Sequence, residues 1–385
     1  MRLPGSLLFI LVPKGNAGVV RILYDGAIFV EQSFGGITRY FNNLIARLPD
    51  TFTPIVTTFS DRRVNSAHAN LKVRSFTRFR PGCISYPLAK YYFEGVSAYE
   101  RPNLAHPTYY YLLANQDICR YRFPVAITVY DMIYELFPDK VESSTRHYVI
   151  ESKRKAIMSA QALICISEKT KRDLLRFFPG VESKVTVIPL ATDLDESLSY
   201  GGEPVPDRPY FLFVGDRAGY KNFAFFLNAF ARAIDKQQEA ALAIVGQPLS
   251  DSENGFIERL GLSKNIEYYG LVSDRLLAKL YRCSLALIYP SLYEGFGIPP
   301  LEAFACGTIV VAAEGSGVSE IVGSGCLFFK PEDTSELADI LQAIINGLID
   351  HTSLVEAGRH RSREFNWERT ASQTVDLYLS LSSHA

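Results

Sequence analysis

The sequence lacks the features of several common protein classes. Its six cysteines are scattered, with no C-x-x-C pair, which argues against a disulfide framework or a zinc site and favours free thiols in a reducing compartment. No segment reaches the roughly 18–20 apolar residues that span a bilayer. The run LLFILV near the N-terminus is shorter than the apolar core of about 7–15 residues in a signal peptide. We interpret residues 1–19 as an extension before the first strand and expect a cytoplasmic protein.

The chain also has almost no net charge, −1 over 385 residues, but its charge is unevenly distributed. Residues 1–190 contain 25 Lys and Arg against 15 Asp and Glu, and the remainder contains 15 against 26. A basic first half suits a peripheral contact with an anionic membrane surface or a lipid-phosphate acceptor; an unevenly charged solvated surface is the alternative. The basic clusters at 74–80 and 153–155 carry no nucleic-acid motif, so nucleic acid is not an expected partner.

Apolar β-branched runs alternate with helical patterns along the chain, which is typical of parallel sheets with crossover helices. Strands are expected at 20–25, 52–59, 71–76, 125–130, 162–167, 185–190, 210–215, 241–246, 266–270, 285–291 and 308–313, and helices at 36–48, 84–99, 143–160, 222–235, 274–282 and 367–381. The sequence thus predicts two doubly wound domains, 1–192 and 210–365, a linker at 193–209 and a terminal helix within 366–385. Ligands are expected in a cleft at the carboxyl ends of the strands.

The most informative stretch is YEGFGIPPLEAFACG, residues 293–307. Glu294 and Glu302 flank a loop that contains Gly295 and Gly297 and runs into a helix start. Glycine lets the backbone approach a ligand closely, and the free N–H groups of a helix start favour anions. A site for a sugar nucleotide needs amides that bind the oxyanions and carboxylates that accept hydrogen bonds from the hydroxyls. For Glu302, a plain complement to the helix dipole is the alternative.

Two glutamates separated by seven residues, with GFG and P-x-x-E-A between them, resemble the signature of the family-4 retaining glycosyltransferases of GT-B fold. The resemblance covers nearly the whole chain from about residue 20. It implies two Rossmann-like domains facing a central cleft and a C-terminal helix that crosses back to the first domain. It also implies that Glu302 binds the ribose hydroxyls of a nucleotide-sugar, and that Glu294 with the amides of Gly295, Phe296 and Gly297 holds the donor sugar or its phosphate.

Two further loops carry groups suited to phosphate. The segment FGGITRYFNNL places Gly35 and Gly36 before a helix start, which can cradle an anion or simply turn a strand into a helix. The segment FVGDRAGYKNF places Arg217 and Lys221 just past a strand, where two cations suit a diphosphate leaving group; solvated surface charge is the alternative. The resemblance implies that the first loop borders the acceptor and donor phosphates and that the second clamps the diphosphate without a metal ion.

Two strand ends in the first half carry titratable groups. His106 could bind a sugar or help to move a proton, and a buried histidine that caps a strand is the alternative. Related sequences often carry His-Asp where this chain has Tyr130 and Asp131, so His106 is the better candidate for a catalytic histidine. Asp193 and Asp195 have the D-x-D spacing of metal-dependent transferases of the other major fold, but they lie in the predicted linker, and no metal site is expected.

Two weaker matches to the family complete the set. Ser167, Thr170 and Asp173 match a Ser-x-x-Thr-x-x-Asp run, although the residues themselves predict only a helix N-cap. Glu320 lies in GSGVSEIV, which matches a family loop that faces the donor.

The resemblance implies retaining transfer of a hexosyl group from a nucleotide-sugar to a glycan or lipid-linked saccharide in surface-polysaccharide biosynthesis. The segments GYKNF and YDMIYELFP resemble those of bacterial mannosyltransferases, so GDP-mannose is the first choice of donor. UDP-glucose, UDP-N-acetylglucosamine or a deoxysugar nucleotide stays open, because the base contacts of this fold, here near Leu271 and Val272, are largely backbone.

No obvious nucleophile faces the donor, so we expect front-face substitution in which the leaving phosphate assists deprotonation of the acceptor. Glu294, His106, Arg217 and Lys221 are the predicted catalytic residues, and no cofactor is expected. A nucleotide-sugar epimerase of the same fold is a rival that the Glu-x7-Glu loop argues against. A non-catalytic glycan-binding relative would be expected to have lost the glutamates or the Arg–Lys pair.

Overall fold

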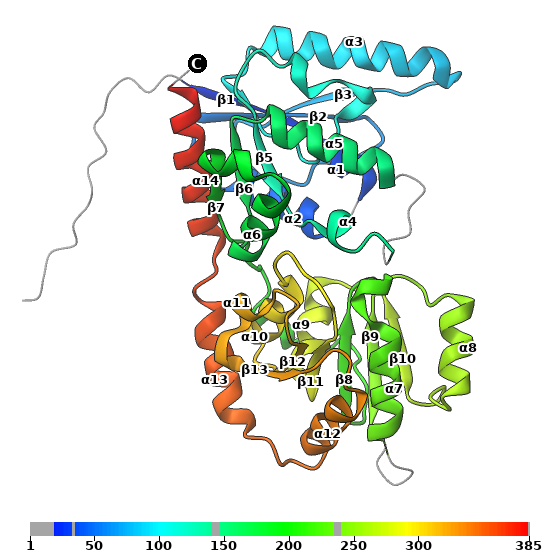
Figure 1. Cartoon of the computed structure of the whole chain (residues 1–385). Coiled ribbons are helices and arrows are strands. Elements are labelled where there is room, and N and C mark those ends of the chain that lie inside the picture. The colour runs from blue at the N-terminus through cyan, green and yellow to red at the C-terminus, as the bar shows by residue number, and fades with distance from the viewer. Residues whose placement is uncertain (1–18, 33–34, 140–145, 235–239, 384–385) are drawn as a thin grey trace, which may run out of the picture.

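The computed structural model describes residues 19–32, 35–139, 146–234 and 240–383. The chain forms two lobes, one above the other in Figure 1, and its last helix returns from the lower lobe to the upper one. Both lobes are built on parallel strands with helices between them, which confirms the predicted α/β class with two Rossmann-like domains.

The upper lobe contains a four-stranded sheet, order β3-β2-β1-β4, and a three-stranded sheet, order β5-β6-β7. Its strands are β1 (Val20–Asp25), β2 (Phe52–Phe59), β3 (Lys72–Phe76), β4 (Leu104–Ala105), β5 (Ala126–Val129), β6 (Ala162–Cys165) and β7 (Val185–Val187). A parallel bridge between Ala105 and Val125 joins the two sheets. All eight residues of β2 are buried, as expected for a parallel strand covered on both faces.

The helices of this lobe are α1 (Ala27–Glu31), α2 (Gly36–Ala46), α3 (Gly82–Glu100), α4 (Ile133–Leu136), α5 (Arg146–Ser159) and α6 (Glu168–Phe177). α2 buries the apolar stripe that its spacing predicts, including Tyr40, Phe41, Leu44 and Ile45. The predicted helix at 143–160 is found from Arg146, and its first three residues lie outside the described part of the chain.

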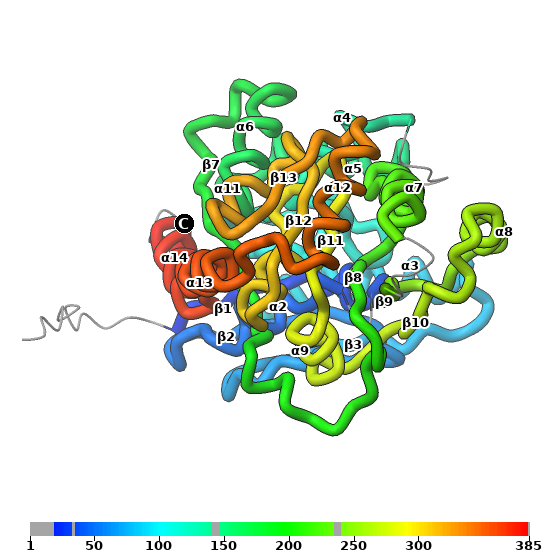
Figure 2. Tube along the Cα trace, turned by 90° about the horizontal axis from the view of Figure 1, so that it is seen from below, coloured from blue at the N-terminus to red at the C-terminus, as the bar shows by residue number. Residues whose placement is uncertain are grey.

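The lower lobe holds one six-stranded sheet, order β10-β9-β8-β11-β12-β13. Its strands are β8 (Tyr210–Val214), β9 (Ala241–Val245), β10 (Ile266–Gly270), β11 (Ala286–Tyr289), β12 (Val310–Ala313) and β13 (Cys326–Phe329), and its helices are α7 (Phe223–Ala233), α8 (Asp251–Arg259), α9 (Asp274–Cys283), α10 (Ile298–Ala305), α11 (Ser319–Val322), α12 (Thr334–Ile345) and α13 (His351–Ser362). Helices α7 and α12 pack on one face of the sheet and α9 and α10 on the other (Figure 2).

The chain reverses direction across the sheet between β8 and β11, and between β1 and β4 in the upper lobe. In open α/β sheets, ligands bind at the carboxyl ends of the strands beside such a reversal. The architecture therefore directs attention to the loops that follow β8, β11 and β1.

The last helix, α14 (Trp367–Ser382), lies against the upper lobe (Figure 1). Trp367 and Tyr378 are buried in the upper core, and the Tyr378 hydroxyl lies 3.2 Å from that of Tyr24. These contacts confirm that the C-terminal helix crosses back. Within the described residues, no helix has the length and apolar character needed to cross a bilayer.

The segment predicted as a linker, 193–209, packs on the lower lobe. Its 3₁₀ turn, Glu196–Ser199, contacts α9. Lys279 of α9 donates hydrogen bonds to the carbonyls of Gly201 (2.9 Å) and Glu203 (2.5 Å). These hydrogen bonds hold the segment between the two domains against the lower lobe.

Candidate active site

The loop between β11 and α10 carries the paired glutamates and lies at the junction of the lobes. Pro299 and Pro300 occupy the first turn of α10, and Gly297 precedes it with φ +110°. A Cβ added to Gly297 would lie 2.6 Å from a Val318 methyl carbon. Backbone angle and space therefore both require glycine here.

Glu302, on α10, is held by groups from both lobes. Its Oε2 accepts a hydrogen bond from the Tyr281 hydroxyl (2.9 Å), and its Oε1 lies 3.4 Å from Nη1 of Arg39, which is on α2 of the upper lobe. Arg39 also pairs with Asp274 at 2.6 Å. Burial raises the pKa of Glu302, opposed by Arg39 and Tyr281. A largely buried carboxylate within reach of donors is suited to accept hydrogen bonds from a diol.

Glu294 pairs with Lys221. Lys221 Nζ lies 2.8 Å from Glu294 Oε1, and their side chains are 17% and 12% exposed. Burial alone would lower the pKa of Lys221, but the carboxylates of Glu294 and Asp216 raise it above its usual value. Lys221 therefore carries a positive charge at the junction between the lobes, where a diphosphate would find it.

Arg217 lies in the same loop as Lys221 but is engaged differently. Its Nε binds Glu253 at 2.6 Å, and its Nη2 donates to the carbonyls of Gln247 and Pro248. The side chain is 5% exposed, and Nη1 is buried with no hydrogen-bond partner in the described part of the chain. Nη1 has no partner there but is also covered by protein atoms, so the predicted clamp of a diphosphate by Arg217 stays a prediction.

The glycine loop also joins the two lobes. The Gly295 carbonyl accepts hydrogen bonds from Ser167 Oγ (2.5 Å) and Thr170 Oγ1 (3.0 Å) at the start of α6. A Cβ at Gly295 would lie 1.9 Å from the Tyr130 carbonyl oxygen, so glycine is needed for the lobes to approach. Ser167 is the N-cap of α6, as predicted, since it accepts a bond from the Thr170 N–H.

The family match predicts that Glu320 faces the donor, but its side chain binds the start of α6 instead. Its carboxylate accepts hydrogen bonds from the N–H groups of Glu168 (2.8 Å) and Lys169 (2.9 Å), at the first turn of α6. Backbone amides at a helix start attract a carboxylate, so Glu320 joins the lower lobe to the upper one. The expectation that this residue faces the donor is corrected accordingly.

The prediction that His106 is catalytic is also wrong. The side chain is fully buried, with Nδ1 2.6 Å from the Tyr378 hydroxyl and Nε2 2.8 Å from Thr128 Oγ1. Burial lowers the pKa of His106 to about 3. Both ring nitrogens have partners within the core, so the imidazole is neutral and cannot touch a substrate. His106 is therefore a buried histidine at a strand end, the alternative named above.

The depressed pKa of His106 predicts a pH effect on stability. The unfolded chain binds a proton near pH 6.5 whereas the folded one does so near pH 3, so this contribution is complete above pH 6.5 and is lost as the pH falls toward 3. We expect a loss of about 1.4 kcal/mol per pH unit in this window. Denaturant unfolding of wild type and His106→Gln between these pH values measures it. An unchanged slope in the variant would contradict the assignment.

Tyr130, which replaces the family's usual histidine, points into the upper lobe. Its hydroxyl donates to the carbonyl of Thr108 (3.1 Å), and its N–H donates to the Tyr110 hydroxyl (3.0 Å). Burial raises the pKa of Tyr130 well above its usual value. Tyr130 therefore braces the loop after β4, and its backbone carbonyl faces Gly295.

The remaining predicted residues lie at the rims of the same region. Gly36 is the exposed first residue of α2, and a Cβ there would lie 3.4 Å from Ile298 of the lower lobe. Gly35 precedes the helix with extended backbone, and no side chain of the described residues caps this end. After β10, Leu271 is 70% exposed and Val272 is half-buried. Their roles toward a donor stay predictions.

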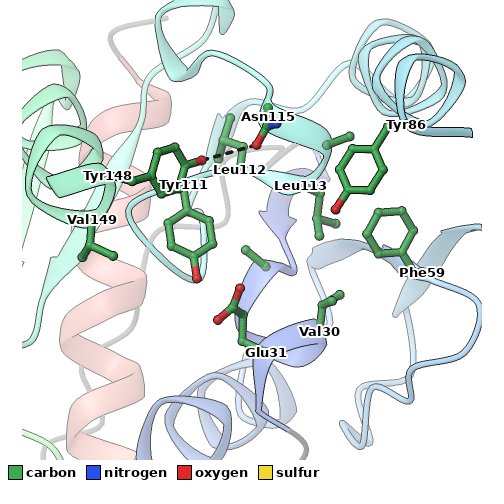
Figure 3. Close-up of a pocket in the computed structure, with 12 residues that line it drawn as sticks. Val30, Glu31, Phe59, Tyr86, Tyr111, Leu112, Leu113, Asn115, Tyr148 and Val149 are labelled. Carbon is green, nitrogen blue, oxygen red and sulfur yellow. Dashed lines mark hydrogen bonds between the residues drawn. The ribbon is translucent and has the colours of Figure 1, made fainter. Parts of the chain in front are cut away.

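A cavity of about 220 Å³ lies in the upper lobe beside α1 (Figure 3). Its walls combine the rings of Phe59, Tyr86, Tyr111 and Tyr148 with the polar groups of Glu31 and Asn115. The Tyr148 hydroxyl donates to Asn115 Oδ1 at 3.4 Å. Sequence reasoning missed this cavity, because its residues come from five separate segments.

The backbone on the rim of this cavity is unusual. Two successive non-glycine residues, Ala114 and Asn115, have positive φ angles of 54° and 53°. Such conformations cost energy and persist where the surroundings enforce them, often at binding sites. Aromatic faces next to a carboxylate and an amide suit a saccharide, whose C–H faces stack and whose hydroxyls bind polar groups.

The two parallel-sheet lobes, with charged pairs gathered between them, define a transferase of GT-B architecture. The model described as "Glycosyltransferase Family 4" matches residues 34–196, and that described as "Glycosyl transferases group 1" matches residues 201–361. The chain belongs to the family-4 glycosyltransferases.

Curated relatives are transferases of several kinds. O-antigen chain mannosyltransferase B of Escherichia coli is 26% identical over 263 residues, 65% of this chain and 69% of that protein. Alpha-maltose-1-phosphate synthase of Mycobacterium tuberculosis is 25% identical over 301 residues, 71% of this chain and 77% of that protein. The MMP alpha-(1->4)-mannosyltransferase of Mycolicibacterium hassiacum is 29% identical over 234 residues, 60% of this chain and 56% of that protein.

Solved structures share the fold. Sucrose-phosphate synthase from Thermosynechococcus elongatus aligns with a TM-score of 0.76 at 22% identity, covering 95% of this chain and 100% of that one. Anabaena Alr3699/HepE, in complex with UDP and glucose, aligns with a TM-score of 0.70 at 20% identity, covering 94% and 100%. At these identities the likeness establishes the fold alone.

Proposed function

We propose that this glycosyltransferase moves a mannosyl group from GDP-mannose, with retention, to a glycan or lipid-linked saccharide in surface-polysaccharide assembly. The observation that carries the nucleotide-sugar site is the pair of carboxylates at the lobe junction, Glu302 with Arg39 and Glu294 with Lys221. Two relatives named as mannosyltransferases support the sugar.

In this proposal each group has one task. Glu302 accepts hydrogen bonds from the ribose hydroxyls, and Glu294 orients the donor sugar. Lys221, with the positive charge of Arg217, balances the charge that develops on the diphosphate as the C1–O bond breaks. The amides at the start of α2, behind Gly35 and Gly36, add a positive dipole end.

No side chain is assigned as a nucleophile. The leaving phosphate oxygen takes the proton of the acceptor hydroxyl while that hydroxyl attacks C1 from the same face, which retains the anomeric configuration. His106 has no part in this scheme. The saccharide acceptor is proposed to bind in the aromatic cavity of the upper lobe, with the Glu31 carboxylate and the Asn115 amide directed to its hydroxyls.

A glucosyl transfer from another nucleotide-sugar to a sugar phosphate is the second candidate. It is favoured by the relative named for alpha-maltose-1-phosphate synthesis, which covers 71% of this chain. A UDP-sugar is the alternative to GDP-mannose as donor in the same type of sugar transfer.

Thermal stabilisation by GDP and by UDP at equal concentration, with and without magnesium, tests the proposal. A ligand at about 100 times its Kd adds about 2.7 kcal/mol to the free energy of unfolding. We expect a GDP-selective shift that does not need magnesium. A UDP-selective shift would overturn the donor and leave the reaction class, and dependence on magnesium would overturn the metal-independent scheme. No shift with either would contradict a GDP- or UDP-sugar donor.

A further inference from the structure

The side of α3 that faces away from the protein is apolar along the whole helix. We define the outer face of α3 as the exposed residues that share this side: Ile84, Pro87, Leu88, Tyr91, Gly95, Ala98 and Tyr99. Ile84, Leu88, Tyr91 and Tyr99 are 52%, 47%, 70% and 79% exposed. The opposite side packs on the upper lobe through Ala89, Phe93 and Val96. The helix thus has two apolar sides, and only one of them is covered.

Single exposed apolar residues are ordinary, whereas a contiguous patch marks an interaction site. At about 1.5 Å per residue, the patch extends over about 22 Å between Ile84 and Tyr99. Phe79 and Tyr92, both exposed, have ring centroids 6.4 and 5.6 Å from that of Phe76 and add aromatic surface next to the helix. Figure 1 shows α3 at the outer end of the upper lobe, away from the lower lobe and the candidate active site.

The charge around this face is mainly positive. Residues 72–101 contain six Lys and Arg against two Asp and Glu. Both acids are paired with cations: Glu100 with Lys72 (3.1 Å) and Arg74, and Glu94 with Arg120 (2.7 Å). Exposed Arg80 and Arg101 stand at the two ends of the helix. The outer face itself contains no charged residue, so an apolar strip is bordered by cations.

We propose that the outer face of α3 docks on an anionic lipid bilayer. An apolar strip that includes tyrosines suits the boundary between headgroups and acyl chains, where tyrosine is enriched, and the bordering cations suit lipid phosphates. A second copy of the chain fits less well, because two such faces would bring their basic borders together. The helix would lie in the plane of the interface.

This docking surface adds a membrane contact to the proposed function. Tyr86 belongs to α3 and also lines the aromatic cavity (Figure 3). A docked protein would hold that cavity beside the bilayer, where a lipid-linked saccharide presents its sugar. The docking itself needs neither donor nor turnover, so it can fail or hold independently of the proposed reaction.

Co-sedimentation of the full chain with vesicles tests the proposal, with phosphatidylcholine alone compared with phosphatidylcholine plus phosphatidylglycerol. We expect wild type to bind the anionic vesicles, and the Leu88→Ser/Tyr91→Ser variant to bind about tenfold or more weakly. Leu348→Ser, which removes a 75% exposed leucine from the lower lobe, is the matched control and should bind like wild type. An unchanged melting temperature establishes that the double variant is folded.

Three results would overturn the proposal: no binding of wild type to anionic vesicles, equal binding of the double variant, or an equal loss in the Leu348→Ser control. Sedimentation velocity tests whether a second copy of the chain covers this face instead. A wild-type dimer that the double variant converts to a monomer would assign the outer face of α3 to a second copy. Nucleotide stabilisation that fails while vesicle binding persists would count against the proposed donor alone.

Discussion

Replacing Lys221 with alanine is expected to lower kcat of sugar transfer by about 10²–10³-fold, because the variant loses a buried cation aimed at the developing charge of the leaving group. Lys221 Nζ lies 2.8 Å from Glu294 and its side chain is 17% exposed, so water cannot easily replace it. The rate of nucleoside diphosphate release measures the effect. Lys264→Ala, which removes an exposed lysine of the lower lobe, should leave the rate unchanged.

A structural explanation for the same loss would be that Glu294 is left unpaired. The double variant Lys221→Ala/Glu294→Gln separates the two causes, since it removes the unpaired charge. Because Glu294 has its own proposed task, the double variant is compared with Glu294→Gln alone, and it stays much slower than Glu294→Gln if Lys221 acts on the leaving group. A double variant as fast as Glu294→Gln would show that Lys221 serves only to neutralise Glu294.

The second large effect is expected at Glu302. Glu302→Ala should reduce kcat/KM by about 10²–10⁴-fold, since two hydrogen bonds to a charged group are lost, each contributing about 1.5–3 kcal/mol. Most transfer is then lost at ordinary donor concentrations. Steady-state kinetics measures the change, with Glu258→Ala, at an exposed position of α8, as the control. Near-normal kcat/KM would remove Glu302 from the site.

A nucleotide without ribose hydroxyls makes the test for Glu302 specific. Wild type should be stabilised more by GDP than by 2′,3′-dideoxy-GDP, and Glu302→Ala should no longer distinguish them. If the variant still prefers GDP, another group reads the ribose. The Arg39 contact to Glu302 could also hold the two lobes together, but loss of that contact would affect both nucleotides equally.

The fold could be predicted from the sequence because its signals are local. Alternating apolar runs place the strands and main helices within a few residues of their observed bounds, as in β1 and β2. The Glu294–Glu302 loop was likewise recognisable, since its glycines, prolines and acids lie within one short segment. The helix start behind Gly297 follows from the same local chemistry.

The site could be predicted only in part, because its remaining contacts join distant segments. Arg39 and Glu302 are 263 positions apart, and His106 and Tyr378 are 272 apart. A histidine at a strand end gives no sign that a returning C-terminal helix covers it. Glu320 likewise looks like a loop acid until α6 brings two amides to it. The residue types at these positions indicated which reactions or contacts they could support. Tertiary packing decided which of these side chains a substrate can reach.

The anomeric configuration of the first product tests the central claim most directly. Wild-type protein, incubated with GDP-α-mannose and water or an added saccharide as acceptor, can be followed by ¹H NMR before mutarotation. The account predicts an α-configured product, GDP release in step with it, and loss of both in Lys221→Ala. A β-configured first product would contradict retention, and undiminished release by the variant would contradict the site.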